Sequence, residues 1–509
     1  MKLEILLLGC ILLIAAFLRS YQITTNPPGL YLDEVSIGYN AYKILTTGKD
    51  EFGKSYPLFF KSFGDYKMPI YIYAVSSSMA LFGKNEFAIR FPALITGTLS
   101  VIVLYFFVKE LLLLDRKKYA EAYRKWCPYL AAFLLAISSW HIQFSRGGFE
   151  VTLAAFLYLF GSLLVTFFWK KQNILLLYFG YLLYILSMYS YHVFRIIVPL
   201  TLVFLSVVLY KRFIKQRKHI YAVTIGTVVL TLPLMLFSFS PHGSERFLQT
   251  SSFAEYKADT LLDKIKTYPL VYIKNYLSFF SLDFLFTFGD GIGRHQMSGF
   301  GLLYRWQLPF LLIGIVYLLR QKKSLLKNVI IFLLLVSPIA AAIARPSPHS
   351  LRSLMMVFPL TICIAFGLLY CFVIVKRFKR IAFFSLIIIA SVEFSFYIHN
   401  YYVHYPKVNI NDWDSGYKQI IQEAKPYEKK YDILVVDSNF TFLPTYFLFY
   451  NEDAKPYFVN TSWVKPKKWN GKKILLIRRF YEENKSDKII HNVYLPNPNK
   501  DTVAQFWEL

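Results

Sequence analysis

Apolar runs of about 20 residues recur along the whole chain and limit its fold more than any other feature. One such run can cross a bilayer as a helix, whereas a soluble domain does not need many of them. Of the 509 residues, 56% are hydrophobic. The sequence therefore predicts an all-α polytopic membrane protein with about eleven transmembrane helices, at 3–18, 89–114, 127–144, 149–169, 173–189, 194–210, 219–238, 307–319, 328–343, 352–375 and 381–398.

Lys and Arg are concentrated in every second loop between these runs. The basic loops are 115–126, 170–171, 211–218, 320–327 and 376–380. Because short basic loops stay in the cytoplasm, we expect a multi-pass protein of the cell membrane with a cytoplasmic N-terminus and an extracytoplasmic C-terminus. The same pattern accounts for the net charge of +26, so nucleic acid is not expected as a partner.

The last part of the chain has a different character from the rest. Residues 399–509 are polar, and a helical stretch at 412–425 precedes β-like runs at 432–437 and 472–479. We expect a small extracytoplasmic α/β domain at 399–509 after a transmembrane domain at 1–398, whose large outer loops are 19–88 and 239–306. The apolar stretch 70–82 is too short to span and is predicted to be a helix at the outer membrane surface.

An acidic pair, Asp33-Glu34, stands in the first outer loop. Carboxylates close to an apolar span are costly unless they face water, a partner or a substrate. Neighbouring residues on a helix point about 100° apart, so the two cannot both face one substrate atom. Asp33 also precedes a stretch with helical apolar spacing, which leaves helix capping and catalysis both open for it.

The outer loops also carry arginines and histidines that the topology rule does not require. They are Arg146, Arg195, Arg294, Arg345 and Arg352, accompanied by His141, His192, His295 and His349. Because arginine offers paired donors to phosphate, we interpret the set as a site for an anionic headgroup at the membrane surface. For any single arginine, the alternative is a side chain that reaches toward lipid headgroups or caps a helix.

Short motifs follow one another along the outer ends of the predicted spans. They are LDEVSIGYNAY, DYKMPIYIY, FAIRFPALITG, HIQFSRGGFE, YSYHVFRIIVPL, FTFGDGIGRH and PHSLRSLMMVFPL. In their order and sidedness, the motifs resemble those of the polyprenyl-phosphate-sugar-dependent glycosyltransferases of the GT-C fold. Closest are the protein O-mannosyltransferase and aminoarabinose transferase-like proteins. The resemblance covers most of the chain, although no single motif is diagnostic.

The resemblance implies an inverting transfer of a sugar from a polyprenyl-phosphate donor to an acceptor hydroxyl on the extracytoplasmic side. It implies that Asp33 is the catalytic carboxylate, with Glu34 as its acidic neighbour. The residues expected to bind the donor phosphate are Lys67, Arg294, Arg352 and Arg146. Those expected to bind substrate are Asp65, Tyr66, Asp290, His295 and His349. Asp65 lies two residues before Lys67, whereas the aminoarabinose transferases have their acidic residue directly before the lysine.

The expected partners are the polyprenyl-phosphate sugar, a protein, lipid or glycan acceptor, and membrane lipid. The sequence requires no cofactor, although a divalent metal at Asp33, Asp65 and His295 is compatible with it. Two alternatives belong to other classes: a transporter or flippase of a lipid-linked or sugar substrate, and a membrane scaffold. The interiors of the spans are almost free of charge, which favours chemistry at the outer surface over passage through the membrane.

Overall fold

The computed structural model describes residues 2–63, 65–208, 210, 217–241, 243–244, 250–255, 260–374, 379–437, 442–454, 456–459, 471–478, 488–494 and 502–508. The chain forms two compact units. The first, here called the bundle unit, comprises Met1–Tyr21, Pro57–Ala74 and Arg90–Ile398. The second, the mixed unit, comprises Gln22–Tyr56, Val75–Ile89 and His399–Leu509. The expected domain boundary after residue 398 stays a prediction.

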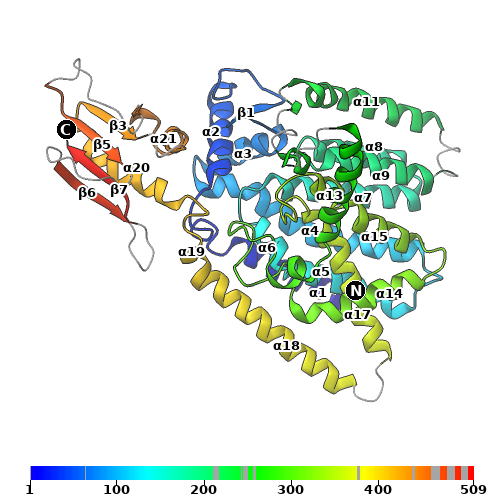
Figure 1. Ribbon diagram of the computed structural model, residues 1–509. Helices are drawn as coiled ribbons and strands as arrows, with labels where there is room; N and C mark the ends of the chain where they lie inside the picture. Colours follow the sequence, from blue (N-terminus) through cyan, green and yellow to red (C-terminus); the bar gives the residue numbers. More distant parts are fainter. Residues whose placement is uncertain are drawn as a thin grey trace. The chain divides into compact units, whose positions relative to one another are not determined.

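The bundle unit consists mainly of apolar helices (Figure 1). It contains α1 (Lys2–Ser20), α5 (Glu121–Ala136), α6 (Ser139–Phe144), α7 (Glu150–Lys171), α8 (Ile174–Met188), α9 (Phe194–Val208), α11 (Arg217–Phe239), α13 (Leu261–Ser278), α14 (Leu308–Arg320), α15 (Leu325–Val336), α16 (Ile339–Ile343), α17 (Val357–Ile374) and α18 (Lys379–His399). Residues of α3 (Pro69–Phe82) and α4 (Glu86–Leu114) belong to both units.

Every apolar segment expected to span the membrane contains a helix. Among the described residues, 7 helices are long and apolar enough to cross a bilayer, so the chain is a polytopic membrane protein while the expected number of spans stays a prediction. Two expected spans are each divided into two helices: 328–343 into α15 and α16, and 127–144 into α5 and α6. The cause of the division at 127–144 is local: the Ser138 hydroxyl accepts a hydrogen bond from the backbone N–H of His141 and starts a new helix.

Helices α14 and α17 pack with their backbones close together. A Cβ atom placed on Gly314 would lie 1.8 Å from the carbonyl oxygen of Cys363, and one on Gly367 would lie 1.9 Å from that of Phe310. Only glycine fits at such a crossing, as at many helix contacts inside membranes. The two glycines therefore set the separation of these helices.

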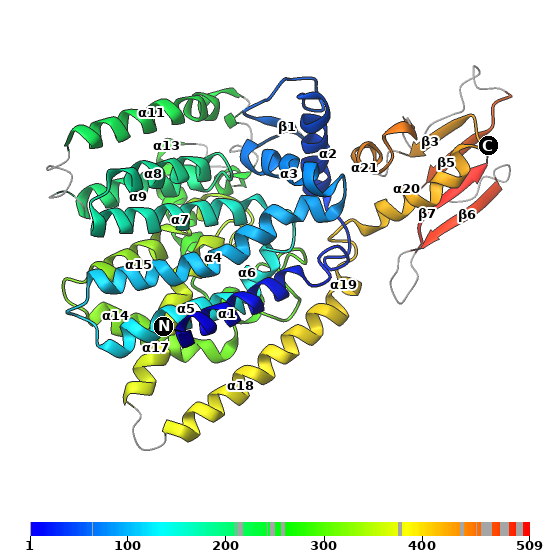
Figure 2. The same ribbon diagram turned by 180° about the vertical axis from the view of Figure 1, so that it is seen from behind.

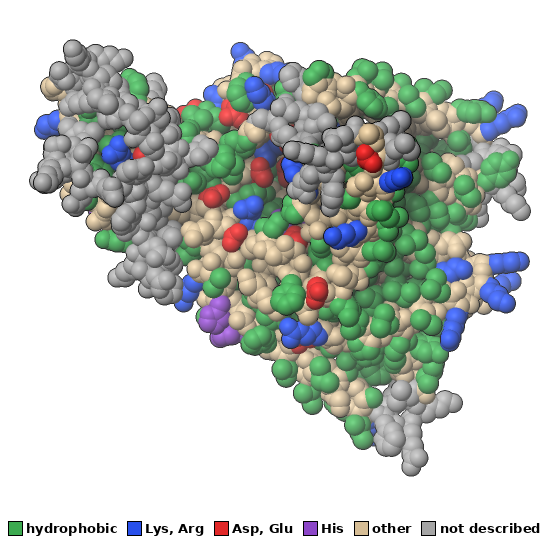
Figure 3. All heavy atoms as spheres, in the orientation of Figure 1, with side chains coloured by type: hydrophobic (Ala, Val, Ile, Leu, Met, Phe, Trp, Pro, Cys, Tyr) green, Lys and Arg blue, Asp and Glu red, His purple; other side chains and the backbone are tan. Residues whose placement is uncertain are grey.

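Three of the expected basic loops meet at one end of the bundle unit. The Asp115 carboxylate, after α4, accepts hydrogen bonds from the Ser324 hydroxyl and the Leu326 N–H at the start of α15. Lys170, at the end of α7, pairs with Glu110 of α4 at 2.8 Å. Figure 3 shows basic side chains at this end and apolar side chains along the helices. The cluster agrees with the alternating charge of the sequence.

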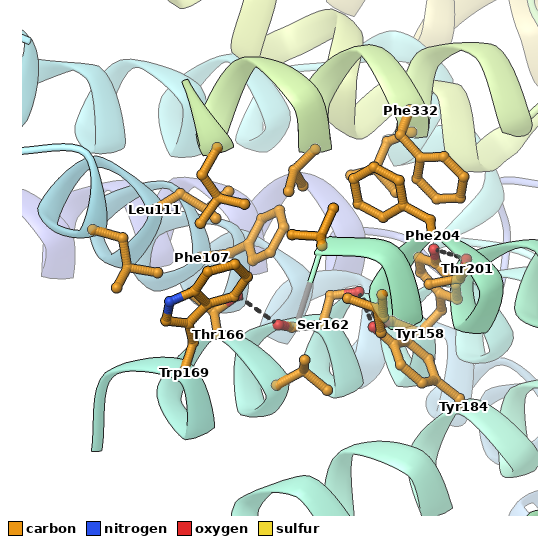
Figure 4. Close-up of a pocket in the computed structure, with 17 residues that line it drawn as sticks. Phe107, Leu111, Tyr158, Ser162, Thr166, Trp169, Tyr184, Thr201, Phe204 and Phe332 are labelled. Atoms are coloured by element: carbon orange, nitrogen blue, oxygen red, sulfur yellow. Dashed lines mark hydrogen bonds between the residues drawn. The ribbon is translucent and has the colours of Figure 1, made fainter. Parts of the chain in front are cut away.

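A small apolar cavity of about 40 Å³ lies toward the same end, between α4, α7, α9 and α15 (Figure 4). Its hydroxyl groups have partners within the protein: Tyr158 pairs with Thr201 at 2.6 Å, Ser162 pairs with Tyr184 at 3.0 Å, and Thr166 donates to the Ser162 carbonyl oxygen at 2.8 Å. Because these polar groups already have partners, we do not regard this cavity as a reaction site.

The mixed unit contains α2 (Leu32–Thr47), α19 (Tyr405–Val408), α20 (Ser415–Glu428), α21 (Leu443–Tyr450) and a five-stranded sheet of order β4-β3-β5-β7-β6. The strands are β3 (Ile433–Asp437), β4 (Tyr457–Val459), β5 (Ile474–Arg478), β6 (Lys488–Tyr494) and β7 (Thr502–Glu508). Strands β3, β4 and β5 run parallel, and β7 is antiparallel to β5 and β6. The small α/β domain expected at the C-terminal end is confirmed, with α20, β3 and β5 at the predicted segments.

Candidate active site

A short hairpin carries one group of predicted site residues in the bundle unit. Strand β1 (Phe60–Ser62) pairs with β2 (Asp65–Lys67), and α3 begins directly afterwards at Pro69. The Tyr66 ring packs edge-on against Phe237 of α11, with ring centroids 5.2 Å apart. The ribbon of the hairpin lies beside one end of α11 (Figure 1, Figure 2). The hairpin thus fixes Asp65, Tyr66 and Lys67 beside the end of α11.

The next basic residues are His192, in the turn between α8 and α9, and Arg195, in the first turn of α9. The Arg195 guanidinium donates to the Ser238 hydroxyl at 3.1 Å and contacts the Met68 sulfur at 2.7 Å. A cavity of about 560 Å³ lies here, with mainly apolar walls from α9, α11 and α16. Its basic side chains are His192, Arg195 and Arg352. The cavity therefore combines mainly apolar walls with two cationic side chains in its lining.

The ring of His192 is a common neighbour of several positive charges. Burial, followed by the charges of Arg195, Lys67 and Arg352, lowers the pKa of His192 well below its ordinary value. A hydrogen bond to the Tyr66 backbone opposes this shift only in part. His192 is consequently neutral at physiological pH and adds no fourth charge to the group. The three cations favour an anion in this region.

A second cluster is built around Asp290. Its Oδ2 atom accepts hydrogen bonds from His295 Nδ1 at 2.7 Å and from the N–H and hydroxyl of Ser350 at 2.8 Å and 2.7 Å. Burial opposes ionisation of this carboxyl, but the hydrogen bonds from His295 and Ser350 outweigh it and hold the pKa of Asp290 below its ordinary range. Asp290 is therefore a buried anion held in a fixed orientation.

His349 adjoins this cluster. Its Nδ1 lies 3.9 Å from Asp290 Oδ2, and its ring centroid lies 4.8 Å from that of His295. Burial and then the charge of Arg352 keep the pKa of His349 far below its ordinary value, and Arg294 acts in the same direction. The Asp290 cluster thus lies next to two of the predicted phosphate-binding arginines.

Asp290, His295 and His349 each offer one ligand atom, and these atoms lie within 4.8 Å of one another. Within the described part of the chain, these three side chains form the group that could hold a metal ion. It shares only His295 with the expected set of Asp33, Asp65 and His295, and that expected set stays a prediction.

Asp33 and Glu34 lie in the mixed unit, in the first turn of α2. The N-cap of this helix is Tyr31 and not Asp33, so the capping alternative for Asp33 is wrong. Glu34 has the capping role: its Oε2 accepts a hydrogen bond from the Tyr31 N–H at 3.2 Å, and its side chain is fully buried. Asp33 is half-buried, and its catalytic role stays a prediction.

Arg146 is fully buried in the bundle unit. Its guanidinium donates hydrogen bonds to the carbonyl oxygens of Leu18 at 2.9 Å and Tyr21 at 2.7 Å. Arg19 is also fully buried and donates to the carbonyl oxygens of Leu135 and Ala136. Both arginines connect the end of α1 to the rest of the bundle, which favours a structural role for Arg146 over the predicted phosphate contact.

No model of a known protein family matches the chain, and no curated protein sequence matches it either. Several solved structures do match the chain. ArnT from Cupriavidus metallidurans bound to undecaprenyl phosphate has a TM-score of 0.56 and 12% identity, covering 99% of this chain and 97% of ArnT. The chain has the GT-C fold.

The same fold relates the chain to a larger protein. The Archaeoglobus fulgidus oligosaccharyltransferase AglB, in complex with an inhibitory peptide and a dolichol-phosphate, has a TM-score of 0.51 and 14% identity over 90% of this chain. The chain spans 64% of the length of that protein. Another structure of this oligosaccharyltransferase contains Zn and sulfate.

Two residues lining the cavity of this GT-C chain were not assigned a role from the sequence. Arg195 and His192 belong to the outer set of arginines and histidines, but the resemblance gave them no function. Their motif, YSYHVFR, places them at the start of α9, and only the structure places Lys67 and Arg352 near the same imidazole. The sequence signal that could have identified them is a basic residue at the outer end of a predicted span.

Proposed function

We propose that the chain is a membrane glycosyltransferase that takes a sugar from a polyprenyl-phosphate donor. The observation that carries this proposal is the group of three cations, Lys67, Arg195 and Arg352, around His192 beside an apolar cavity. A polyprenyl phosphate combines the same two properties, an anionic head and an apolar chain. The GT-C fold and the neighbours' ligands, undecaprenyl phosphate in ArnT and dolichol-phosphate in AglB, support the assignment.

The cations would act mainly on the leaving group. As the bond between the anomeric carbon and the phosphate oxygen breaks, negative charge grows on the departing polyprenyl phosphate. Fixed positive charges stabilise that charge more in the transition state than in the ground state, which is often the largest contribution to catalysis. Arginine also holds phosphate through paired hydrogen bonds, so the donor is oriented as well as bound.

The acceptor hydroxyl would attack the anomeric carbon from the face opposite the leaving phosphate, which inverts the configuration. The new bond joins the acceptor oxygen to the sugar, and the hydroxyl proton passes to Asp33. We assign this base from the resemblance of the LDEVSIGYNAY motif. A positioned general base typically contributes about 10²–10⁴-fold to a rate. The reaction is proposed to take place on the extracytoplasmic side.

Binding of a polyprenyl monophosphate to the purified full-length protein tests the cation cluster. We expect Arg195→Gln and Arg352→Gln each to weaken binding about 10-fold or more, because a hydrogen bond to a charged group is typically worth about 1.5–3 kcal/mol. Arg305→Gln is the matched control, since Arg305 is exposed and lies outside this cavity. Equal affinity in all three variants would contradict the proposed phosphate site.

The product that forms distinguishes the transporter alternative from the proposed glycosyltransferase. A transporter or flippase would move a sugar or a lipid-linked sugar across a proteoliposome membrane without forming a glycosidic bond. The proposed enzyme would release polyprenyl phosphate in proportion to glycosylated acceptor.

A further inference from the structure

We propose that Asp290, His295 and His349 together bind one divalent transition-metal ion of the Zn²⁺ type. The three residues come from two loops of the bundle unit, and Ser350, which follows His349, holds Asp290 in place. The set differs from the one expected from the sequence, and it does not depend on the proposed glycosyl transfer.

The spacing of the ligand atoms fits a metal of this size. Ligands at about 2.0–2.2 Å from a tetrahedral zinc ion stand roughly 3.3 Å from one another. The observed separations from Asp290 Oδ2 are 2.7 Å to His295 Nδ1 and 3.9 Å to His349 Nδ1. One distance is slightly short and the other slightly long. Binding would release to solvent the proton that His295 Nδ1 donates to Asp290, and side-chain shifts of less than an ångström would then complete the site.

An unsatisfied polar atom provides a second, independent observation. Within the described part of the chain, His349 Nδ1 is buried and has no hydrogen-bond partner. The side chain of His349 is only 10% exposed. A buried polar atom without a partner is costly and needs an explanation. Nδ1 lies 3.9 Å from Asp290 Oδ2 without bonding to it, so a metal between them would give His349 the partner that it lacks.

The donor set selects the class of metal. Two imidazole nitrogens and one carboxylate suit zinc and other first-row transition metals, whereas Mg²⁺ and Ca²⁺ prefer oxygen ligands. Three protein ligands also leave a coordination position open, as in catalytic zinc sites. Hydrogen bonds from Ser350 and from the Ile292 N–H, at 3.1 Å, fix the carboxylate in the way that outer partners orient metal ligands.

The competing explanation is a metal-free pair in which His295 donates to Asp290 and His349 only packs against them. The two explanations differ in the effect of His349. In the metal-free pair, His349 contributes no hydrogen bond through Nδ1, so replacing it should leave metal content unchanged. In the metal site, the same replacement removes a ligand.

The experiment uses full-length protein purified in detergent, with any affinity tag removed, stripped with a chelator and titrated with Zn²⁺. Bound metal per chain is measured by elemental analysis, and affinity by calorimetry. We expect one Zn²⁺ per chain, and at least a 10–100-fold weaker affinity for His349→Gln, since even the loss of an outer partner has that effect. His349→Gln is preferred to Asp290→Asn because it removes no hydrogen bond made by Nδ1.

His404→Gln is the matched control for adventitious binding. His404 and His399 are exposed, and their ring centroids lie 5.3 Å apart, so they form a surface pair that could take up metal on its own. We expect this variant to keep the tight site. Absence of stoichiometric metal from the wild type, or unchanged affinity in His349→Gln, would overturn the proposal.

The ligands can also be identified directly. X-ray absorption at the zinc edge should show nitrogen and oxygen neighbours at about 2.0–2.2 Å, with the outer scattering of two imidazole rings. A single ring in His349→Gln is the expected change. A spectrum with sulfur neighbours, or with the same two rings in the variant, would contradict the assignment.

Discussion

Asp33 and Glu34 are neighbours in the sequence but have different surroundings. Glu34 is fully buried and bound to the Tyr31 N–H at the start of α2, whereas Asp33 is half-buried in the same turn. A carboxylate that closes a helix terminus is not free to take a proton from an acceptor without weakening the helix. This separation favours Asp33 as the base and leaves Glu34 as the residue that orients the turn.

Replacing Glu34 should therefore affect stability in a way that depends on hydrogen bonding and not on charge. Glu34→Ala removes the cap and should destabilise the protein by about 1 kcal/mol. Glu34→Gln keeps an acceptor oxygen at the position where Gln also serves in capping boxes. Thermal unfolding in detergent should show a lower midpoint for the alanine variant than for the glutamine variant, and equal midpoints would contradict the capping role.

The residues of the candidate site could be predicted only in part, and the reason is physical. The arginines and histidines stood out because membrane topology did not require them. Whether each one faces a cavity or a backbone carbonyl depends on tertiary contacts, which is why Arg146 was grouped with Lys67 and Arg352. The link between Asp290 and His349 likewise joins two loops that no local pattern relates.

At the scale of helices, the contact of α14 with α17 is the most restrictive feature of the bundle unit. Both glycines face a carbonyl oxygen of the other helix, and backbone cannot move aside as a flexible side chain can. The close approach is therefore fixed by Gly314 and Gly367, which a hydropathy pattern does not reveal.

Gly367→Ala should separate these two helices and lower the free energy of unfolding by about 1–3 kcal/mol, the usual range for overpacking. The matched control is Gly226→Ala in α11, where a new Cβ would meet nothing within 4 Å. The control should be neutral or slightly stabilising, because alanine is the better helix former. Unfolding midpoints that fall equally in the two variants would contradict the packing argument.

The positions of the helices and strands along the chain were the most predictable feature of the fold. Apolar runs gave the positions of the helices, and short β-branched runs gave β3 and β5, because both signals are local. The division of 127–144 was missed since Ser138 is one polar residue in an apolar run. Its effect comes from a hydrogen bond to a neighbouring backbone group, which hydropathy does not record.

For the molecule as a whole, the charge pattern makes a prediction about sidedness. Cysteines introduced at Lys117, in a basic loop, and at Lys429, in the C-terminal part, would both be exposed. A membrane-impermeant thiol reagent applied to intact cells should label Lys429→Cys, and should label Lys117→Cys only after permeabilisation. The four natural cysteines require an unsubstituted control. The opposite labelling pattern would invert the proposed topology.

The central claim is that this GT-C chain transfers a sugar from a polyprenyl-phosphate donor with Asp33 as the base. The most direct test reconstitutes the full-length protein in liposomes with a panel of labelled polyprenyl-phosphate sugars and a membrane extract as acceptor, and measures released polyprenyl phosphate and glycosylated product. We predict that the wild type forms both in equal amounts and that Asp33→Asn loses at least about 100-fold in rate while inserting normally. Full activity in Asp33→Asn, or sugar movement without a new glycosidic bond, would contradict the claim.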